Sequence, residues 1–319
     1  MGVPSAAPTT SRRWQLPGRP SVTVIVATRD RRELLARAID SIWRQDYEGP
    51  VDCVVVFDQC TPHELPSGAP AGRSVRGIVN ERRPGLAGAR NTGILGTSGD
   101  LVAFCDDDDE WEPDKLTRQI ALLRSRPDAC FAATGIRVFT RGREVVRQAP
   151  ASATFDDLLI SRITAIHPSS FLVLRDALVG EIGLVDESIP GSYGEDYDLL
   201  LRAARLAPVV SVPGPLVRVH WTGSSFFADR WATIAAANEW LLEHYPEFGG
   251  HPRAAAFLEG KVAFARAAAG DRAGARQWAR RALRHSWKQH RAYAALLAAS
   301  GVVRPDVVMR TANALGRGI

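Results

Sequence analysis

The sequence predicts an α/β protein in which a mixed, mainly parallel sheet is flanked by helices and followed by an all-α C-terminal extension. Short apolar runs without polar alternation are typical of strands buried on both faces. Each early run is followed by a segment with helical periodicity, a succession that favours parallel pairing. From about residue 230 onward the periodicity is helical only. A chain of 319 residues with 45% hydrophobic content suits one or two globular domains.

Strands and helices alternate over the first part of the chain. Residues 22–27 read VTVIVA, an all-apolar run that predicts a buried strand. Asp30 is expected to cap the helix that follows. The apolar face of this helix comprises Leu34, Leu35, Ala38, Ile39, Ile42 and Trp43. Further strands are predicted at residues 51–57, 76–79 and 101–105, and further helices at 85–97 and from Pro113 to about Arg124.

The middle of the chain is less regular. Residues 131–147 alternate around Gly135 and Gly142, which indicates strands joined by a hairpin. Three segments follow: a strand at residues 171–174, a helix at 195–206 and an edge or irregular strand at 209–219. Pro213 and Pro215 interrupt the last of these, and proline cannot donate to a sheet ladder.

The N-terminus and the cysteines indicate a cytoplasmic protein. Residues 1–20 lack the apolar segment of a signal peptide and are expected to be a disordered tail. No apolar run reaches the roughly 18 residues that a membrane-spanning helix needs. The cysteines have no C-x-x-C spacing and fall in or beside apolar runs, so reduced thiols in or near the core are expected. They are Cys53, Cys60, Cys105 and Cys130.

The C-terminal segment differs from the rest of the chain in charge. Residues 251–319 hold 13 Lys and Arg against 3 Asp and Glu, a net charge of +10, whereas residues 1–250 hold 27 against 32, a net charge of −5. Helices are predicted at about 230–245, 253–269, 272–286, 289–299 and 305–315. Four residues within 270–283 match half of a tetratricopeptide repeat: Gly270, Ala275, Ala282 and Leu283. Because one repeat cannot bury its own face, these helices are expected to pack on the rest of the chain or on a partner.

Four consecutive aspartates, Asp106 to Asp109, follow the predicted strand 101–105. A run of charges is often only a solvated loop, but ligands bind at the carboxyl ends of strands in open α/β sheets. Two carboxylates ~5 Å apart repel by roughly 3 kcal/mol at an effective dielectric of ~20, which favours a bound cation. Trp111 and Thr117 stand where a calcium loop needs Gly and Glu. The chain also lacks the P-loop and dinucleotide patterns, so Mg²⁺ or Mn²⁺ shared with a nucleotide's phosphates is expected.

An ordered set of motifs resembles the family 2 glycosyltransferases, which have the GT-A fold, over about residues 21–225. The matching segments are SVTVIVATRDRRELLARAIDSIWRQ, VVVFDQC, GLAGARNTGILGTSGDLVAFCDDDDEWEPDKL, GLVDES, GEDYDLLLRAA and LVRVHWTGSS. The resemblance implies a Rossmann-like GT-A domain at residues 21–228 and a helical extension at 229–319.

The resemblance also implies a nucleotide-sugar site. Ala27, Thr28 and Arg29 match positions that line the base, and Asp58 matches an acid that accepts hydrogen bonds from the base. This geometry favours a uracil or thymine ring, and so a UDP- or dTDP-sugar. Arg90 would lie near the sugar diphosphate. The alternatives are a turn-closing role for Asp58 and a helix-surface position for Arg90.

The family's Asp-x-Asp motif maps onto Asp106 and Asp108. Asp106 would approach the ribose or the metal, and Asp108 would bind Mg²⁺ or Mn²⁺ directly. Since the aspartates are consecutive, the register is open by one residue and Asp107 can also contribute, with Asp109 in support. His220 resembles a position that contacts the metal or the diphosphate.

An acidic pair opens the predicted helix at 195–206. Inverting transfer needs a base to take the acceptor's hydroxyl proton. Asp196 matches the family's base, and Glu195 would orient the acceptor or support the base. The alternative is an acidic helix N-terminus favoured by the helix dipole. His167 lies in a stretch that the family uses near the acceptor, but it carries less weight.

Together these features predict an inverting, metal-dependent glycosyltransferase. The acceptor can be a saccharide, a lipid-linked molecule or a small molecule. Whether the protein forms a homo-oligomer is also left open. The basic tail is expected to be a set of packed helices with an arginine-rich solvent face. The alternative is a peripheral contact with an anionic surface at the inner face of the membrane or with a lipid-linked acceptor; a nucleic-acid partner is not expected. A sugar nucleotidyltransferase is disfavoured because ATRDRRE has no glycine. The other alternative is an inactive GT-A-like scaffold protein whose basic tail recruits a partner or membrane.

Overall fold

The computed structural model describes residues 13–140, 142–221, 230–301 and 307, and the chain divides into two compact units. The first unit comprises residues 1–155, 163–184 and 202–220. The second unit comprises residues 156–162, 185–201 and 221–319. The domain boundaries predicted at residues 20 and 228 stay predictions.

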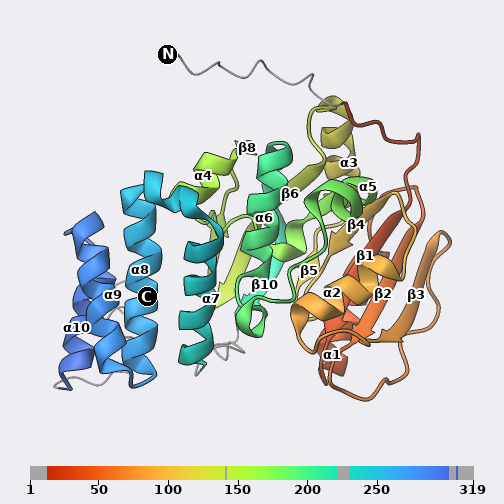
Figure 1. The fold of residues 1–319 in the computed structure, drawn as a ribbon. Helices are drawn as coiled ribbons and strands as arrows, with labels where there is room; N and C mark the ends of the chain where they lie inside the picture. The colour runs from red at the N-terminus through yellow and green to blue at the C-terminus, as the bar shows by residue number, and fades with distance from the viewer. Residues whose placement is uncertain (1–12, 141, 222–229, 302–306, 308–319) are drawn as a thin grey trace, which may run out of the picture. The chain divides into compact units, whose positions relative to one another are not determined.

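One half of the sheet in the first unit is parallel. Its strands are β1 (Val22–Thr28), β2 (Val51–Phe57), β3 (Arg73–Val79) and β4 (Leu101–Phe104). They lie in the order β3-β2-β1-β4 (Figure 1), with Thr28 opposite Phe57 and Ile25 opposite Phe104. The carboxyl ends of β2, β1 and β4 therefore meet at one edge, as the apolar runs predicted.

The other half of the sheet is antiparallel and continues the order β4-β9-β6-β10-β5. Its strands are β5 (Glu110–Trp111), β6 (Phe131–Thr140), β7 (Arg143–Arg147), β8 (Ser152–Ala153), β9 (Leu172–Leu174) and β10 (Val209–Trp221). The predicted hairpin is β6–β7. The predicted edge position of β10 is wrong, since this strand lies between β6 and β5. The irregularity is confined to mid-strand, where Gly214, with φ +97°, separates exposed Pro213 from Pro215.

Helices flank this sheet. They include α1 (Arg32–Trp43), α2 (Leu86–Leu95), α3 (Lys115–Ser125) and α5 (Arg175–Ala177), with short turns at Pro168–Ser170 and Leu178–Ile182. Helix α1 buries Leu35, Ala38, Ile39 and Ile42, as its periodicity predicted. The predicted Asp30 cap is wrong: Arg31 is the N-cap residue and no side chain caps the helix. Asp30 instead takes a left-handed conformation, with φ +54°.

The second unit is helical. Its helices are α7 (Trp231–His244), α8 (Pro252–Ala268), α9 (Arg272–His285) and α10 (His290–Ser300), with short turns at Pro190–Ser192 and Pro246–Gly250. Helices α8, α9 and α10 lie side by side (Figure 1) around buried alanines, among them Ala279 and Ala295. Gly270, with φ +89°, joins α8 to α9. Four of the five predicted C-terminal helices are confirmed, and the fifth, at 305–315, lies outside the described residues apart from Val307.

Two further helices contribute to the second unit. Helix α4 (Phe155–Ile160) belongs to it from Asp156 onward, and α6 (Glu195–Leu206) belongs to it up to Leu201. The Tyr197 hydroxyl donates to the Leu158 carbonyl over 2.7 Å, so α4 and the first turn of α6 are joined. Helix α4 escaped the sequence analysis because it is short.

Part of the predicted N-terminal tail is hydrogen-bonded to the first unit. The Trp14 N–H donates to the Pro127 carbonyl over 2.7 Å, and the Tyr47 hydroxyl donates to the Pro20 carbonyl over 2.6 Å. Arg124 donates to the Pro17 carbonyl over 3.0 Å. The rest of the predicted tail, residues 1–12, lies outside the described residues.

The four cysteines, all among the described residues, form no disulfide, as the sequence predicted, and three of them are buried. Among the described residues, no helix combines the length and the apolar character that crossing a bilayer requires.

Lys115 is an unusual member of the core. Its side chain is fully buried at the start of α3, and within the described residues its amine has no hydrogen-bond partner. Lys115 Nζ instead lies 3.7 Å from the ring centroid of Trp111, where a cation is attracted by the indole. Burial lowers the pKa of Lys115 to about 7.

We expect Lys115→Met to change how stability depends on pH. Above the pKa of about 7 and below the ordinary value of Lys, the unfolded chain holds a proton that the folded chain has lost. The wild type's free energy of unfolding therefore rises by up to about 1.4 kcal/mol per pH unit in this window, a contribution absent from the variant. Urea unfolding at about pH 7 and about pH 9 measures it. Exposed Lys288→Met is the control; an identical pH slope in wild type and Lys115→Met contradicts the prediction.

Candidate active site

The four aspartates form a loop between β4 and β5 in which Asp107 and Asp109 are buried and Asp106 and Asp108 are half-buried. The Thr28 hydroxyl, at the end of β1, donates to Asp107 Oδ2 over 2.7 Å. Arg31 Nη1 donates to Asp107 Oδ1 over 3.1 Å and to Asp108 Oδ2 over 2.8 Å. The side chains of Asp107 and Asp109 are only 7% and 2% exposed. The loop is thus not a solvated charge run.

Ser169, in the short turn just before β9, supports this loop. Its hydroxyl accepts from the Asp106 N–H over 3.0 Å and donates to Asp109 Oδ2 over 2.6 Å. The indole N–H of Trp111 donates to the Ser169 carbonyl over 2.8 Å. Because β9 runs antiparallel to β4, the residues just before β9 lie at the same edge as the residues just after β4. The sequence analysis missed this bridge, because its partners are at least 60 residues apart in the chain.

Crowding and burial raise the pKa values of aspartates in the loop. Burial raises the pKa of Asp107 to about 6, against the opposing effects of Thr28 and Arg31. Burial, followed by the charge of Asp106, raises the pKa of Asp108 and holds the pKa of Asp109 well above its usual range. A cation in the loop would favour the ionised carboxylates.

One group in this region has the donor atoms of a metal site. Ligand atoms of Asp106, Asp109 and His167 all lie within 4.8 Å of one another. Carboxylate oxygens suit Mg²⁺ and Mn²⁺, and an imidazole nitrogen suits transition metals. These residues therefore fit a divalent cation, with Mn²⁺ suiting the mixed set.

The two other predicted metal ligands have different neighbours. Asp108 is paired with Arg31. His220 Nε2 lies 3.1 Å from Glu110 Oε1, and its ring stacks on Phe139 at 5.3 Å between centroids. The backbone of His220 nonetheless opposes the rise in the pKa of Asp109. The HWTGSS segment continues into residues 222–229, which lie outside the described residues.

Arg90 belongs to the buried part of the site rather than to the surface of α2. Its side chain is 3% exposed, and its Nη2 lies 3.0 Å from Asp106 Oδ1. The guanidinium also lies 5.2 Å from the ring centroid of Phe104. Arg90 thus holds a cationic group beside the carboxylate that opens the loop.

Asp58 organises the turn after β2. Its carboxylate accepts from Asn80 Nδ2 over 2.7 Å, from Gln59 Nε2 over 2.9 Å and from the Gly85 N–H over 3.0 and 3.2 Å. Both oxygens are therefore engaged by protein donors, as the turn-closing alternative expects. The other predicted base-lining residues end β1 close by, with Ala27 half-buried and Arg29 exposed.

Asp196 and Glu195 lie in the second unit, in the first turn of α6, and both are buried. Arg162 donates to Asp196 Oδ2 and forms an ion pair with it. Asp198, in the same turn, accepts from the Tyr245 hydroxyl over 2.5 Å. The sequence analysis missed Arg162, because nothing in the spacing of residues 162 and 196 links them.

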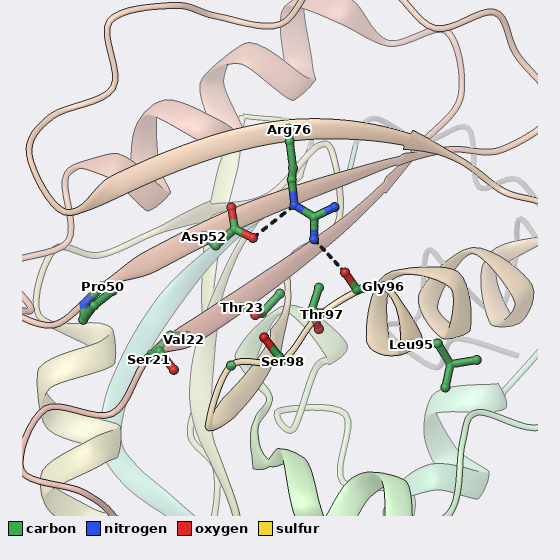
Figure 2. A pocket seen from close by; sticks show the side chains of 11 residues that line it. Ser21, Val22, Thr23, Pro50, Asp52, Arg76, Leu95, Gly96, Thr97 and Ser98 are labelled. Atoms are coloured by element: carbon green, nitrogen blue, oxygen red, sulfur yellow. Dashed lines mark hydrogen bonds and ion pairs between the residues drawn. The ribbon is translucent and has the colours of Figure 1, made fainter.

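A separate pocket of about 490 Å³ lies at the amino ends of β1 and β2 (Figure 2), the opposite ends of these strands from the aspartate loop. Its wall includes Thr23, Asp52 and Ser98. The cation there, Arg76, is already bound by Asp52 over 3.3 Å and by the Gly96 carbonyl over 2.8 Å. We therefore assign the site to the carboxyl edge.

Comparison with known proteins identifies the family. Residues 23–180 match the family described as Glycosyl transferase family 2. A curated relative, the amylovoran biosynthesis glycosyltransferase AmsB of Erwinia amylovora, is 25% identical over 63% of this chain and 69% of its own length. Across the curated relatives, the match spans from 32% to 76% of the relative's own length.

Solved structures share the fold. TarS 1-349 of S. aureus in complex with UDP-GlcNAc has a TM-score of 0.58 at 15% identity, covering 93% of this chain and 92% of that one. The mannosyltransferase PcManGT from Pyrobaculum calidifontis, in complex with GDP-Man and Mn²⁺, has a TM-score of 0.53 at 18% identity, covering 93% and 81%. The chain therefore carries a glycosyl transferase family 2 domain and is a glycosyltransferase of the GT-A fold.

Proposed function

We propose that the protein transfers a sugar from a nucleoside-diphosphate sugar to an acceptor hydroxyl with inversion, assisted by a divalent cation. The observation that carries this proposal is the partly buried aspartate loop at the carboxyl edge of the parallel strands, with Arg90 and His167 beside it. A buried group of carboxylates next to a guanidinium can hold a diphosphate through a shared cation and through direct pairing.

Asp106, Asp109 and His167 would hold the cation, with Asp108 as a further ligand if Arg31 moves aside. Bound Mg²⁺ or Mn²⁺ would neutralise charge that develops on the departing nucleoside diphosphate. Mn²⁺ in the PcManGT complex supports this assignment. Arg90 would add a fixed positive group on the same side, and Ser169 would keep the Asp106 backbone and the Asp109 carboxylate in register.

The donor nucleotide would bind along the ends of β1 and β2. Ala27, Thr28 and Arg29 would line the base, and Asp58 would accept from it while also holding the loop that begins α2. This arrangement favours a UDP- or dTDP-sugar. TarS in its complex with UDP-GlcNAc supports a uracil nucleotide, whereas PcManGT carries GDP-Man.

Asp196 would act as the base. Its pairing with Arg162 fixes Oδ2 and leaves the orientation of the carboxylate well defined. The carboxylate would take the proton from the acceptor hydroxyl as that oxygen attacks the anomeric carbon, while Glu195 orients the acceptor. AmsB is named for amylovoran biosynthesis, which favours a saccharide, free or lipid-linked, as the acceptor. A cytoplasmic location and a homo-oligomer stay predictions of the sequence.

Asp196→Asn tests the base. The amide keeps the shape of the side chain but cannot take a proton, so kcat should fall by roughly 10²- to 10⁴-fold with donor KM little changed. Transfer from a UDP-sugar is measured by release of UDP. Asp156→Asn, at a side chain that is 74% exposed, is the matched control. Equal rates for wild type and Asp196→Asn, without metal dependence in either, would favour the scaffold alternative.

His167→Gln and His220→Gln distinguish the two sets of candidate metal ligands. Loss of His167 should raise the Mn²⁺ concentration for half-maximal activity roughly 10- to 100-fold, whereas loss of His220, which faces Glu110, should change it only slightly. Activity is titrated with Mn²⁺ at saturating donor. The reverse result would assign the cation to Asp108 and His220, as the family motif suggests.

Asp58→Ala tests base recognition. Because the change leaves buried donors without an acceptor, the free energy of unfolding should fall by about 1–3 kcal/mol. If Asp58 also meets the base, the Kd for UDP should rise more than the Kd for pyrophosphate. Calorimetric titration measures both ligands, and equal weakening would leave Asp58 with the turn-closing role alone.

A further inference from the structure

The two C-terminal helices carry an exposed surface that combines apolar and basic side chains. Its apolar members are Trp287, which is 71% exposed, Tyr293 at 52% and Leu297 at 46%. Its basic members are Arg280, Arg284 and Lys288, all exposed. We name this set the α9–α10 face. Large exposed apolar side chains gathered on one element indicate a binding surface.

Helical geometry places these side chains on one side of the α9–α10 pair. On α9, buried Ala279 and Ala282 share one apolar cluster with Phe264 of α8. At about 100° per residue, Arg280 and Arg284 lie roughly 130–170° around the helix from the mean direction of these alanines. On α9 these arginines therefore face away from α8.

Helix α10 presents its apolar side chains in the same direction. Its Arg291 guanidinium lies 4.5 Å from the ring centroid of Phe257 of α8. Tyr293 and Leu297 lie roughly 120–160° around the helix from Arg291. Since α8 packs against both helices (Figure 1), the basic stripe of α9 and the apolar stripe of α10 lie on the side opposite α8.

Trp287 is fixed at the junction of the two stripes. The Tyr293 hydroxyl donates to the Trp287 carbonyl over 2.9 Å, which ties the α9–α10 connection to α10. Lys288 Nζ lies 5.2 Å from the indole ring centroid. The most exposed aromatic ring of the face is thus bordered by positive charge on the same connection.

Helices α9 and α10 and the connection between them carry positive charge only. Residues 272–300 contain seven Lys and Arg and no Asp or Glu. An acidic partner surface is therefore complementary to this segment. A partner that is only anionic would not account for Trp287, Tyr293 and Leu297, whereas a lipid headgroup region accommodates aromatic rings and leucine beside phosphates.

We propose that the α9–α10 face docks on the surface of an anionic lipid bilayer. Trp287, Tyr293 and Leu297 enter the headgroup region, and Arg280, Arg284 and Lys288 lie against the phosphates. The contact is peripheral, because it uses the sides of two short helices. It does not depend on which sugar the enzyme transfers or on which residues carry out the transfer.

Flotation of the full-length protein with vesicles tests this surface. The wild type should float with phosphatidylcholine vesicles that contain phosphatidylglycerol, float much less with phosphatidylcholine alone, and be released by salt. The triple variant Trp287→Ser, Tyr293→Ser, Leu297→Ser should lose at least tenfold in partition. Arg280→Gln and Arg284→Gln should each lose about fivefold. Val145→Ser, Val146→Ser and Arg143→Gln, exposed in the first unit, are matched controls and should leave the partition unchanged.

Quenching by brominated lipid locates the contact. The tryptophan emission of the wild type should be quenched on anionic vesicles containing brominated lipid, and Trp287→Phe should remove most of that quenching while leaving flotation largely intact. This readout is unaffected by a general loss of stability.

Three results would overturn the proposal. The first is flotation that does not require phosphatidylglycerol or that the control variants weaken equally. The second is dimerisation in solution that the triple variant abolishes, which would make this face a contact between two copies of the chain. The third is binding to heparin or polyglutamate that the charge variants abolish without any flotation of the wild type, which would assign the face to an acidic macromolecule.

Discussion

The site depends on the burial of several carboxylates in one short loop. Four consecutive aspartates repel one another, and the fold keeps them together by surrounding them with donors from separate elements: Thr28, Arg31, Arg90 and Ser169. Parallel pairing of β4 with β1 makes this possible, because it brings the ends of both strands to one edge. The antiparallel entry of β9 adds Ser169 and His167 from the other side. Without this pairing the aspartates would be an ordinary solvated run.

The parallel half of the sheet and the C-terminal helices could be predicted because their signal is local. Unbroken apolar runs specify buried strands, and helical periodicity with buried alanines specifies α7–α10. The acidic loop was predicted for the same reason, since a motif and the strand before it are adjacent in sequence. Strand β10 was misplaced because Pro213 and Pro215 suggest an edge, whereas the neighbours of a strand are set by distant segments.

The parts of the site that escaped prediction are pairs formed by residues distant in the chain. Ser169 hydrogen-bonds Asp106 and Asp109, Arg162 pairs with Asp196, and His167 lies beside the acidic loop. The fold brings these residues together from distant parts of the chain. Asp58 shows a different limit. Its family position was recognised from the sequence, but two of the residues that donate to its oxygens, Asn80 and Gly85, lie more than 20 residues away. Motifs thus identify the candidate site residues, whereas the contacts that decide the role of each residue follow from packing.

The hydrogen bond from the Gly85 N–H to Asp58 connects two ends of the proposed donor site. Gly85 is the N-cap residue of α2, and that helix carries Arg90, which is paired with Asp106. The end of β2 is therefore linked to the aspartate loop through α2, and Asn80 also donates to Asp58. A substitution at Asn80 is therefore expected to change the spacing between the proposed base and diphosphate subsites without replacing any side chain proposed to contact the nucleotide.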